Sequence, residues 1–280
     1  MSSDSVTTHY ARTGLSEAIR AGLESRGIDP TRATIDDLGP VDEFHVGGRA
    51  ASREVAEHLD LAPDLAVLDV GCGLGGPARF LAREYGCRVI GIDLTPEYID
   101  TARTLTEWLD LGDAVDFHVG SALEMPFDDA SFDRGLMVHV GMNIADKRSL
   151  FQDIARVLRP GGVFGVCDIM RRAEGPLTFP VPWAGGSESS FVEKPEVYVE
   201  ALEAAGFEII EERDRHAFAL EFFDAQRARQ EQMDGLPPVG LHLLMGESAP
   251  TKLGNMVKSL RAGAIGPYEI YARKVSHQRS

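Results

Sequence analysis

Short apolar runs recur along the middle of the chain, and polar or amphipathic segments separate them. The runs are rich in β-branched residues and are followed by an acid or a glycine turn, which is typical of buried strands. We expect such strands at 67–70, 88–93, 115–122 with its turn, 135–140 and 163–168. Residues 268–274 alternate with a period of two, which predicts one more strand near the C-terminus.

Helical patterns precede the first predicted strand, at 15–27 and 47–59. They predict an N-terminal helical cap over residues 1–62, followed by a single α/β domain at 63–280. About 280 residues is within the range of one such domain with insertions.

Two segments of this domain exceed ordinary connections between elements. Residues 171–195 follow the strand at 163–168, at the sheet edge where ligands of doubly wound sheets bind, and they form a candidate wall of an acceptor site. Residues 216–266 carry apolar positions at helical spacing and predict a helical lid.

The strand at 67–70 runs into a glycine loop and then into an amphipathic helix. The loop contains four glycines, Gly71, Gly73, Gly75 and Gly76. Such a loop brings backbone amides and a helix N-terminus to a point that a ligand can approach, since no Cβ holds the ligand away. The sequence therefore predicts a nucleotide-binding turn.

Gly71, Gly73 and Gly76 also satisfy the dinucleotide pattern G-x-G-x-x-G, and Asp93 ends the next strand at a suitable distance. One interpretation is therefore a nicotinamide-dependent oxidoreductase. The carboxylate of Asp69, placed before the first glycine, favours a different interpretation over the oxidoreductase.

Three features resemble the class I S-adenosylmethionine (SAM)-dependent methyltransferases: an acid followed by x-G-x-G-x-G at 69–75, the acid Asp93, and the turn at 158–162 that ends a helix beginning near Asp146. The resemblance spans about residues 64–214 and the final strand. It implies an α/β fold with a doubly wound, seven-stranded sheet, its last strand antiparallel. Gly75-Gly76-Pro77-Ala78-Arg79 is similar to the small-molecule group, namely the sterol, tocopherol, quinone and sarcosine/dimethylglycine methyltransferases.

The resemblance implies a cofactor site for SAM. Asp93 is expected to accept hydrogen bonds from the ribose hydroxyls, and Asp69 with the glycine loop is expected to lie against the methionine part. Ser121 replaces the acid of the family's usual Gly-Asp-Ala turn and retains one hydrogen bond without charge assistance. The cofactor-binding candidates are Asp69, Gly71, Cys72, Gly73, Gly75, Asp93, Leu94, Ser121, Ala122 and His139.

Methyl transfer from a sulfonium is an in-line displacement that needs alignment, and a base only where the acceptor loses a proton. His139, at the end of the strand at 135–140, is the first candidate base; His45 and Asp168 are the others. Each has a structural alternative: a packed histidine for His139 and His45, and a helix cap or loop anchor for Asp168. Resemblance to related enzymes also places Tyr10 and residues 43–49 near the acceptor.

The composition argues against some classes of binding partner and location. A formal charge of −16 without any basic cluster argues against nucleic-acid substrates. Three cysteines without framework spacing fit a reducing cytoplasm, and we find no signal peptide or apolar run of membrane-spanning length. We expect a cytoplasmic protein without a bound metal, and the oligomeric state stays open.

The leading hypothesis is a SAM-dependent methyltransferase that acts on a small-molecule acceptor at a nitrogen, oxygen or carbon atom. The alternatives are an NAD(P)-dependent oxidoreductase and a non-catalytic SAM-binding protein. The apolar inserts favour a partly hydrophobic acceptor, whereas the Gly120-Ser121 turn and Asp168-Ile169-Met170 resemble the dimethylglycine group in particular.

Overall fold

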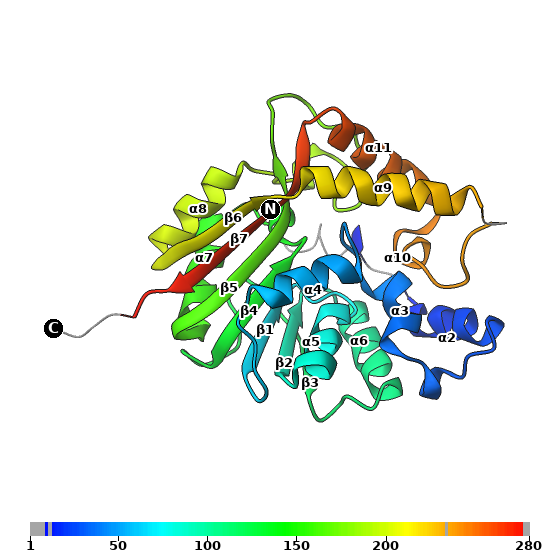
Figure 1. Ribbon diagram of the computed structural model, residues 1–280, viewed down its shortest axis with the longest axis horizontal. Helices are drawn as coiled ribbons and strands as arrows, with labels where there is room; N and C mark the ends of the chain where they lie inside the picture. Colours follow the sequence, from blue (N-terminus) through cyan, green and yellow to red (C-terminus); the bar gives the residue numbers. More distant parts are fainter. Residues whose placement is uncertain (1–8, 11–12, 233–234, 277–280) are drawn as a thin grey trace.

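The computed structural model describes residues 9–10, 13–232 and 235–276. Within these residues a single seven-stranded sheet forms the centre, in the order β3-β2-β1-β4-β5-β7-β6 (Figure 1). Its strands are β1 Ala66–Val70, β2 Arg88–Asp93, β3 Val115–Val119, β4 Phe132–Val138, β5 Leu158–Arg171, β6 Phe207–Asp214 and β7 Ile265–Lys274.

Strands β1 to β5 pair in parallel, and β7 is antiparallel to both of its neighbours, β5 and β6. The predicted doubly wound fold with an antiparallel last strand is therefore confirmed. Two expected boundaries were wrong. Strand β4 ends at Val138 because His139 adopts a positive φ of 57°, which leaves the extended conformation. Strand β5 begins at Leu158, which pairs with Phe132, rather than at 163. Its pairing with β4 resumes at Val163, so the predicted turn at 158–162 is an irregularity within this strand.

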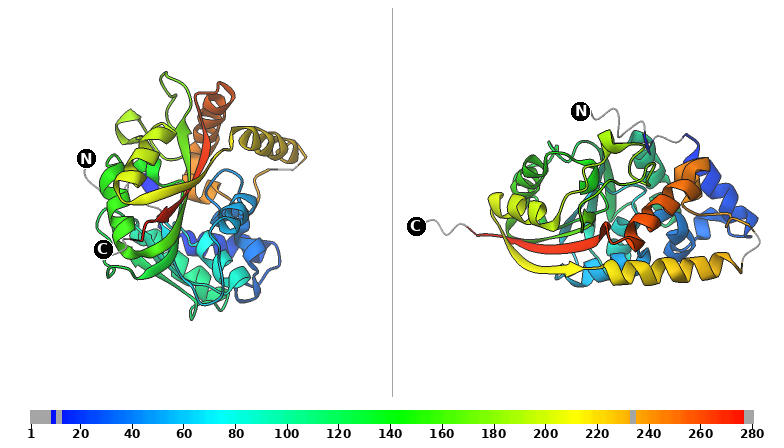
Figure 2. Two further views of the ribbon diagram at one scale, coloured as in Figure 1. Left: turned by 60° about the vertical axis from the view of Figure 1, so that its left-hand side comes forward. Right: turned by 90° about the horizontal axis from the view of Figure 1, so that it is seen from above.

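Helices cover both faces of the sheet (Figures 1 and 2). The α-helices are α2 Leu15–Ser25, α3 Ile35–Asp42, α4 Arg49–Glu57, α5 Gly76–Tyr85, α6 Pro96–Trp108, α7 Lys147–Val157, α8 Pro195–Ala204, α9 His216–Gln230, α10 His242–Met245 and α11 Ala249–Arg261. Short 3₁₀ helices lie between them: η1 Pro30–Arg32, η2 Gly141–Asn143, η3 Ser187–Ser189 and η4 Gly246–Ser248.

Alternation along β1 builds a separate apolar core on each face of the sheet. Val67 packs into the cluster that holds α2 to α6, whereas Leu68 and Val70 pack into the cluster with Phe151 of α7 and Tyr198 of α8. Asp69 stands between Leu68 and Val70 and therefore faces the side of α2 to α6. The pleat thus buries a carboxylate on the face where the cap lies.

The N-terminal cap consists of α2, η1, α3 and α4. Helix α3 starts with a capping box in which Thr34 and Asp37 satisfy each other's backbone amides. Its last residue, Asp42, forms a fully buried ion pair with Arg79 of α5, with Oδ1 2.6 Å from Nη2. This pair fixes the end of α3, and with it the loop 43–48, over the glycine-loop helix.

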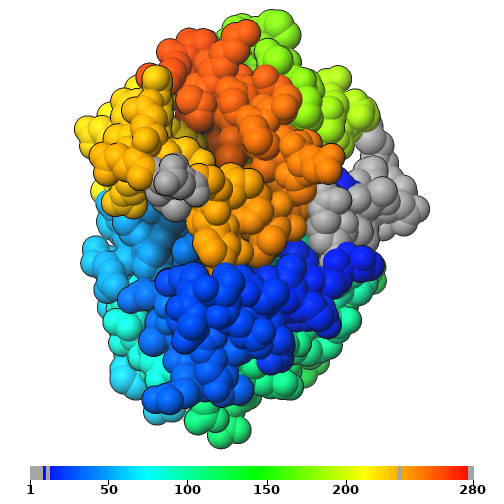
Figure 3. Space-filling model, turned by 90° about the vertical axis from the view of Figure 1, so that its right-hand side faces the viewer, coloured from blue at the N-terminus to red at the C-terminus, as the bar shows by residue number. Residues whose placement is uncertain are grey.

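The insert at 216–266 is helical, as expected, and consists of α9, α10, η4 and α11. Helix α9 continues from the end of β6 and extends along the molecule beyond the sheet (Figure 2). Helix α10 contacts α2, and the space-filling view shows this insert resting on the N-terminal cap (Figure 3). A Cβ at Gly22 would lie 2.5 Å from the backbone oxygen of Pro238, so glycine permits this approach.

The insert at 171–195 has little regular structure and folds around the buried side chain of Trp183. The Trp183 indole N–H donates to Ser190, at 2.9 Å. The backbone N–H of Phe191 donates to the carbonyl of Met142, which holds this segment against the end of β4. Among the described residues, no helix combines the length and the apolar character needed to cross a membrane.

Candidate active site

The glycine loop has the backbone conformation that its composition predicts. Gly71, Gly73 and Gly75 all have positive φ, at 70°, 55° and 82°. A Cβ at Gly71 would lie 2.3 Å from Val140, and one at Gly75 would lie 2.3 Å from Phe117, whereas a Cβ at Gly73 would meet nothing within 4 Å. Gly71 and Gly75 therefore serve the close packing of the loop, and Gly73 opens toward a cavity.

This cavity, of about 380 Å³, lies at the carboxyl ends of the central strands. It is the position at which doubly wound sheets bind their ligands. Nine of the ten predicted cofactor residues line it: Asp69, Gly71, Cys72, Gly73, Asp93, Leu94, Ser121, Ala122 and His139. Gly75, at the start of α5, is absent from the lining because it packs inward, against Phe117 of β3.

Asp93 is held in place by the glycine loop itself. Its Oδ2 accepts the backbone N–H of Gly73 at 3.0 Å, and its Oδ1 accepts that of Thr95 at 2.9 Å. Burial raises the pKa of Asp93, and these hydrogen bonds oppose the shift. A carboxylate with two occupied lone pairs still has two free ones, enough to accept from a vicinal diol.

Asp69 has a buried oxygen, Oδ2, without a hydrogen-bond partner among the described residues. Burial, the Asp93 carboxylate and the Glu43 carboxylate raise the pKa of Asp69 to about 7. An orphaned acceptor beside a glycine loop fits a ligand that carries an ammonium group, such as the methionine part of SAM.

Ser121 also reaches the cavity. Its Oγ accepts the backbone N–H of Leu123 at 3.2 Å, which uses one lone pair and leaves the hydroxyl proton for a ligand. The serine thus closes a local turn, and the neighbouring Ala122 lines the same part of the cavity.

Two histidines from different elements meet in this cavity. The rings of His139, after β4, and His45, in the loop before α4, lie 5.9 Å apart in a T-shaped arrangement. Nε2 of His139 is buried and has no hydrogen-bond partner among the described residues. Burial, together with the neighbouring His45, lowers the pKa of His139 well below its usual range. The ring is therefore neutral at pH 7, and its strained backbone at a cavity is typical of a functional position.

Asp168 lies outside this arrangement. It is fully buried and is not among the described residues that line the cavity. Its Oδ2 accepts the Tyr198 hydroxyl at 2.7 Å, and its Oδ1 accepts the backbone N–H of Ile169 at 2.9 Å. Burial raises the pKa of Asp168 to about 6, with Tyr198 opposing the shift. This environment favours the loop-anchoring alternative over contact with a substrate.

Residues from the cap and the inserts complete the cavity. The Tyr10 hydroxyl donates to Oδ1 of Asn143 at 3.1 Å, and the Asn143 amide donates to the Trp183 carbonyl at 2.7 Å. Phe191 of the first insert and Leu244 of the second also line the cavity. Both inserts were expected near the acceptor from their positions in the sequence, but single residues within them were not identified, because their contacts depend on tertiary packing.

The cavity is acidic and aromatic. Its described lining contains four aspartates and neither lysine nor arginine. Its aromatic side chains are those of Tyr10, Phe44, Tyr98 and Phe191. Within the described residues, no group of three or more histidine, cysteine or acidic side chains is arranged to hold a metal ion.

Comparison with known proteins supports a methyltransferase domain in this chain. Residues 68–166 match the family model of a methyltransferase domain. The methyltransferase GfsG of Streptomyces halstedii is 35% identical over 136 residues, which cover 49% of each chain. A probable chloroplastic tocopherol O-methyltransferase of Oryza sativa subsp. japonica is 38% identical over 164 residues, covering 53% of this chain and 45% of that protein. The chain thus spans about half the length of the curated relatives it matches.

Among solved structures, the [4+2]-cyclase SpnF superposes with a TM-score of 0.69 at 24% identity, covering 98% of this chain and 96% of that one. This likeness shows the fold alone. The resemblance that the motifs predicted is confirmed by the family model and the curated relatives, and SAM is the cofactor of that family.

Proposed function

Because this chain carries a methyltransferase domain of the class I, SAM-dependent family, we propose that it transfers the methyl group of SAM to a small-molecule acceptor. SAM supplies an activated methyl group on a sulfonium, so the protein has to align the acceptor, exclude water and accept a proton where one leaves. The curated relatives include enzymes named for tocopherol and sterol substrates, which supports an acceptor of small-molecule size.

The cofactor half of the cavity is assigned to residues of the sheet edge. Asp93 holds the ribose hydroxyls with the lone pairs that Gly73 and Thr95 leave free. Asp69 faces the ammonium group of the methionine part, and the open side of Gly73 admits its backbone. Ser121 and Ala122 contact the adenine.

The acceptor half is assigned to the histidines and to the cap and insert residues around them. The observation that carries the proposal is the buried, unpartnered Nε2 of His139, which lies on the same cavity as Asp69 and Asp93. Buried polar atoms are nearly always paired, so an orphan at a cavity indicates a ligand-binding position. The His45 and His139 pair is the proposed acceptor of the proton.

The chemistry of the lining favours an acceptor without negative charge. A phosphate or carboxylate is ordinarily bound by arginine, lysine or a helix N-terminus, and the described lining has neither cationic side chain. Aromatic and aliphatic side chains favour a partly apolar molecule that bears a hydroxyl or an amine.

Transfer of labelled methyl from SAM into a cell extract tests this proposal. The extract is separated into small-molecule, protein and nucleic-acid fractions, and Asp93→Ala is the control. We expect label in the small-molecule fraction that is lost in the variant. Label confined to macromolecules would overturn the acceptor class.

The fold also supports a second candidate function. The cyclase that superposes over nearly the whole chain shows that this architecture occurs in a protein named for a different reaction. Calorimetric binding of SAM, with no label transferred to any fraction, would favour a non-methylating SAM-binding protein. Competition by NAD(H) but not by SAM would favour the oxidoreductase instead.

A further inference from the structure

The loop between α3 and α4 folds a buried carboxylate against a cavity histidine. Glu43 is 5% exposed, although it lies next to the end of α3 at the rim of the cap. Its Oε2 accepts the Ser52 hydroxyl at 2.6 Å, and its Oε1 lies 2.6 Å from Nε of Arg49. Its third neighbour is His45, whose Nε2 is 3.3 Å from Oε2. Three partners thus fix the orientation of this carboxylate.

The neighbours of Nε2 determine the tautomer of His45. The Gly48 carbonyl, at 3.1 Å, and Glu43 Oε2 can only accept hydrogen bonds. Ser52 donates its proton to Glu43, so its Oγ, 3.2 Å from Nε2, also acts as an acceptor. Nε2 must therefore carry the proton, and Nδ1 must carry the lone pair.

The lone pair on Nδ1 of His45 is available to a ligand in the cavity. His45 lines the cavity, and no described residue makes a hydrogen bond to its Nδ1. The His139 ring flanks it at 5.9 Å, without a carboxylate of its own. Of the two histidines, only His45 has a neighbouring carboxylate, that of Glu43, which can stabilise a positive charge.

We propose that Glu43 is a positioning residue for His45. Together with the Gly48 carbonyl it holds the Nε2–H tautomer, and it stabilises the imidazolium that forms when His45 Nδ1 takes the proton of the methyl acceptor while His139 flanks it. This inference rests on the proposed methyl transfer and names which histidine is the base. Carboxylate–histidine pairs act in this way in other enzymes, where the carboxylate holds the tautomer and stabilises the imidazolium.

The step balances without any further reactant. A lone pair of the acceptor oxygen or nitrogen forms the bond to the methyl carbon, and the carbon–sulfur bond breaks with its electron pair left on sulfur. The acceptor O–H or N–H bond gives its proton to His45 Nδ1. The positive charge lost by the sulfonium is thereby balanced by the imidazolium, which faces Glu43.

The charged and titratable groups packed against His45 come from three elements. Glu43 lies on its own loop, Arg49 on α4, and the neutral His139 at the end of β4. Burial lowers the pKa of His45, Glu43 raises it, and Arg49 lowers it. Removing the charge of Glu43 should therefore lower the pKa of His45 further.

Nitrogen-15 NMR of the histidine rings in the full-length protein tests the tautomer directly, without an acceptor. His45→Gln assigns the resonance. We expect a protonated Nε2 and an unprotonated Nδ1 in the wild-type protein. In Glu43→Gln we expect a lowered pKa of His45, while the Gly48 carbonyl still holds the proton on Nε2. An Nδ1–H tautomer in the wild type, or an unchanged spectrum in the variant, would overturn the proposal.

Glu54→Gln is the matched control, since Glu54 is a carboxylate on α4 that is bound by arginines but lies away from the cavity. It should leave the His45 resonances unchanged. If Glu43→Gln fails to fold, Glu43→Asp shortens the side chain by one carbon, moves the carboxylate away from His45 and should also lower the pKa of His45. A changed His45 spectrum in Glu54→Gln would mean that the fold, rather than Glu43, holds the ring.

Methyl transfer with the acceptor recovered from the extract provides the kinetic readout. Glu43→Gln should lower kcat by roughly 10- to 100-fold and move the acidic limb of its pH profile, while SAM affinity is unchanged. An unchanged kcat together with a lowered pKa of His45 would refute the catalytic part of the inference. Absence of methyl transfer in the wild type would instead refute the proposed function, and the NMR result would still stand.

Discussion

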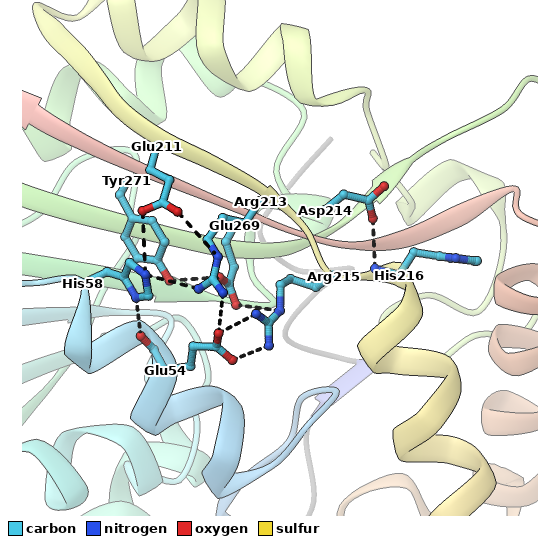
Figure 4. Close-up of polar contacts among 9 residues, drawn as sticks. All are labelled: Glu54, His58, Glu211, Arg213, Asp214, Arg215, His216, Glu269 and Tyr271. Carbon is cyan, nitrogen blue, oxygen red and sulfur yellow. Dashed lines mark hydrogen bonds and ion pairs between the residues drawn. The ribbon is translucent and has the colours of Figure 1, made fainter.

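Two polar clusters flank helix α4, and they differ in how their buried charges are matched. In the network of Figure 4, Glu54 of α4 binds Arg213 at the end of β6 and Arg215 just after it, and both arginines also face Glu269 of β7. Tyr271 completes it by donating to Glu269 at 3.1 Å. In the cavity, by contrast, Asp69 Oδ2 and His139 Nε2 have no partner among the described residues.

The titration of the carboxylates reflects this contrast. Burial acts to raise the pKa of Glu54, but hydrogen bonds from Arg215 and Arg213 outweigh it, so its pKa is lowered. At Asp69 burial and two neighbouring carboxylates act together, and the pKa rises to about 7. The network therefore stabilises the fold with its charges, whereas the cavity holds charge at a cost that a ligand can relieve.

Breaking the cofactor side of the cavity should have the largest effect. Asp93→Ala removes the carboxylate proposed to accept two ribose hydroxyls and releases the N–H groups of Gly73 and Thr95. We expect SAM affinity to fall by roughly 10²- to 10⁴-fold, since each charge-assisted hydrogen bond contributes about 1.5–3 kcal/mol. Isothermal titration calorimetry measures the loss. Affinity within a factor of three of the wild type would remove Asp93 from the site.

Loss of the unpartnered histidine should have the next largest effect. His139→Asn is the suitable variant, because asparagine tolerates the positive φ of 57° at this position. Methyl transfer should fall by about 10²-fold at nearly unchanged SAM affinity, since the ring is proposed to orient the acceptor beside His45 and not to contact the cofactor's charged groups. Single-turnover rates at saturating SAM measure it. An equal loss of SAM affinity would place His139 on the cofactor side instead.

The network should respond in stability rather than in activity. Glu54→Ala leaves Arg213 and Arg215 with the buried Glu269 and the more exposed Glu211, and the free energy of unfolding should fall by about 2–3 kcal/mol after allowance for the part that water reaches. Urea unfolding measures this difference, with Arg227→Ala in the exposed pair of α9 as the matched control. A variant that keeps full stability but loses SAM binding would contradict the division between the two clusters.

The sequence predicted the cavity better than the network. The glycine loop, Asp69 and Asp93 lie within one βαβ segment, where spacing along the chain determines spacing in the fold. The seven-stranded sheet followed from the same local patterns. The network joins Glu54, Arg213 and Glu269, which are far apart in sequence and meet only after β6 and β7 pair beside α4. No periodicity in one segment carries that information.

The same limit explains which residues of the site could be predicted from the sequence. His139 was identified because it ends a strand, and His45 because it lies in a motif-like loop. Asp168 also ends a predicted strand, yet β5 continues beyond it to Arg171, and Tyr198 of α8 covers it. Glu43 was expected near the acceptor within residues 43–49 but received no role of its own, since its importance lies in contacts with His45 and Arg49 that a sequence pattern does not reveal.

The smallest expected effect is that of Asp69 on the stability of the SAM-free protein. Its sign distinguishes the cavity carboxylate from Glu54 in the network. The folded-state pKa of about 7 lies above the ordinary value of 3.8, so between these values the folded protein keeps a proton that the unfolded chain releases. Stability without SAM should therefore decrease as pH rises through this window, and the full penalty applies above pH 7. Asp69→Asn should then stabilise the SAM-free protein at pH 8 by about 1–2 kcal/mol, a value moderated by water in the cavity.

The same substitution should weaken SAM binding, because the amide cannot pair with an ammonium group. Thermal unfolding at pH 4 and pH 8, without and with SAM, measures both effects in one experiment. At pH 4 the wild type holds Asp69 mostly protonated, so the stabilising effect of the variant should nearly vanish there. If Asp69→Asn destabilised the SAM-free protein at pH 8, the carboxylate would belong with Glu54 among the groups that support the fold.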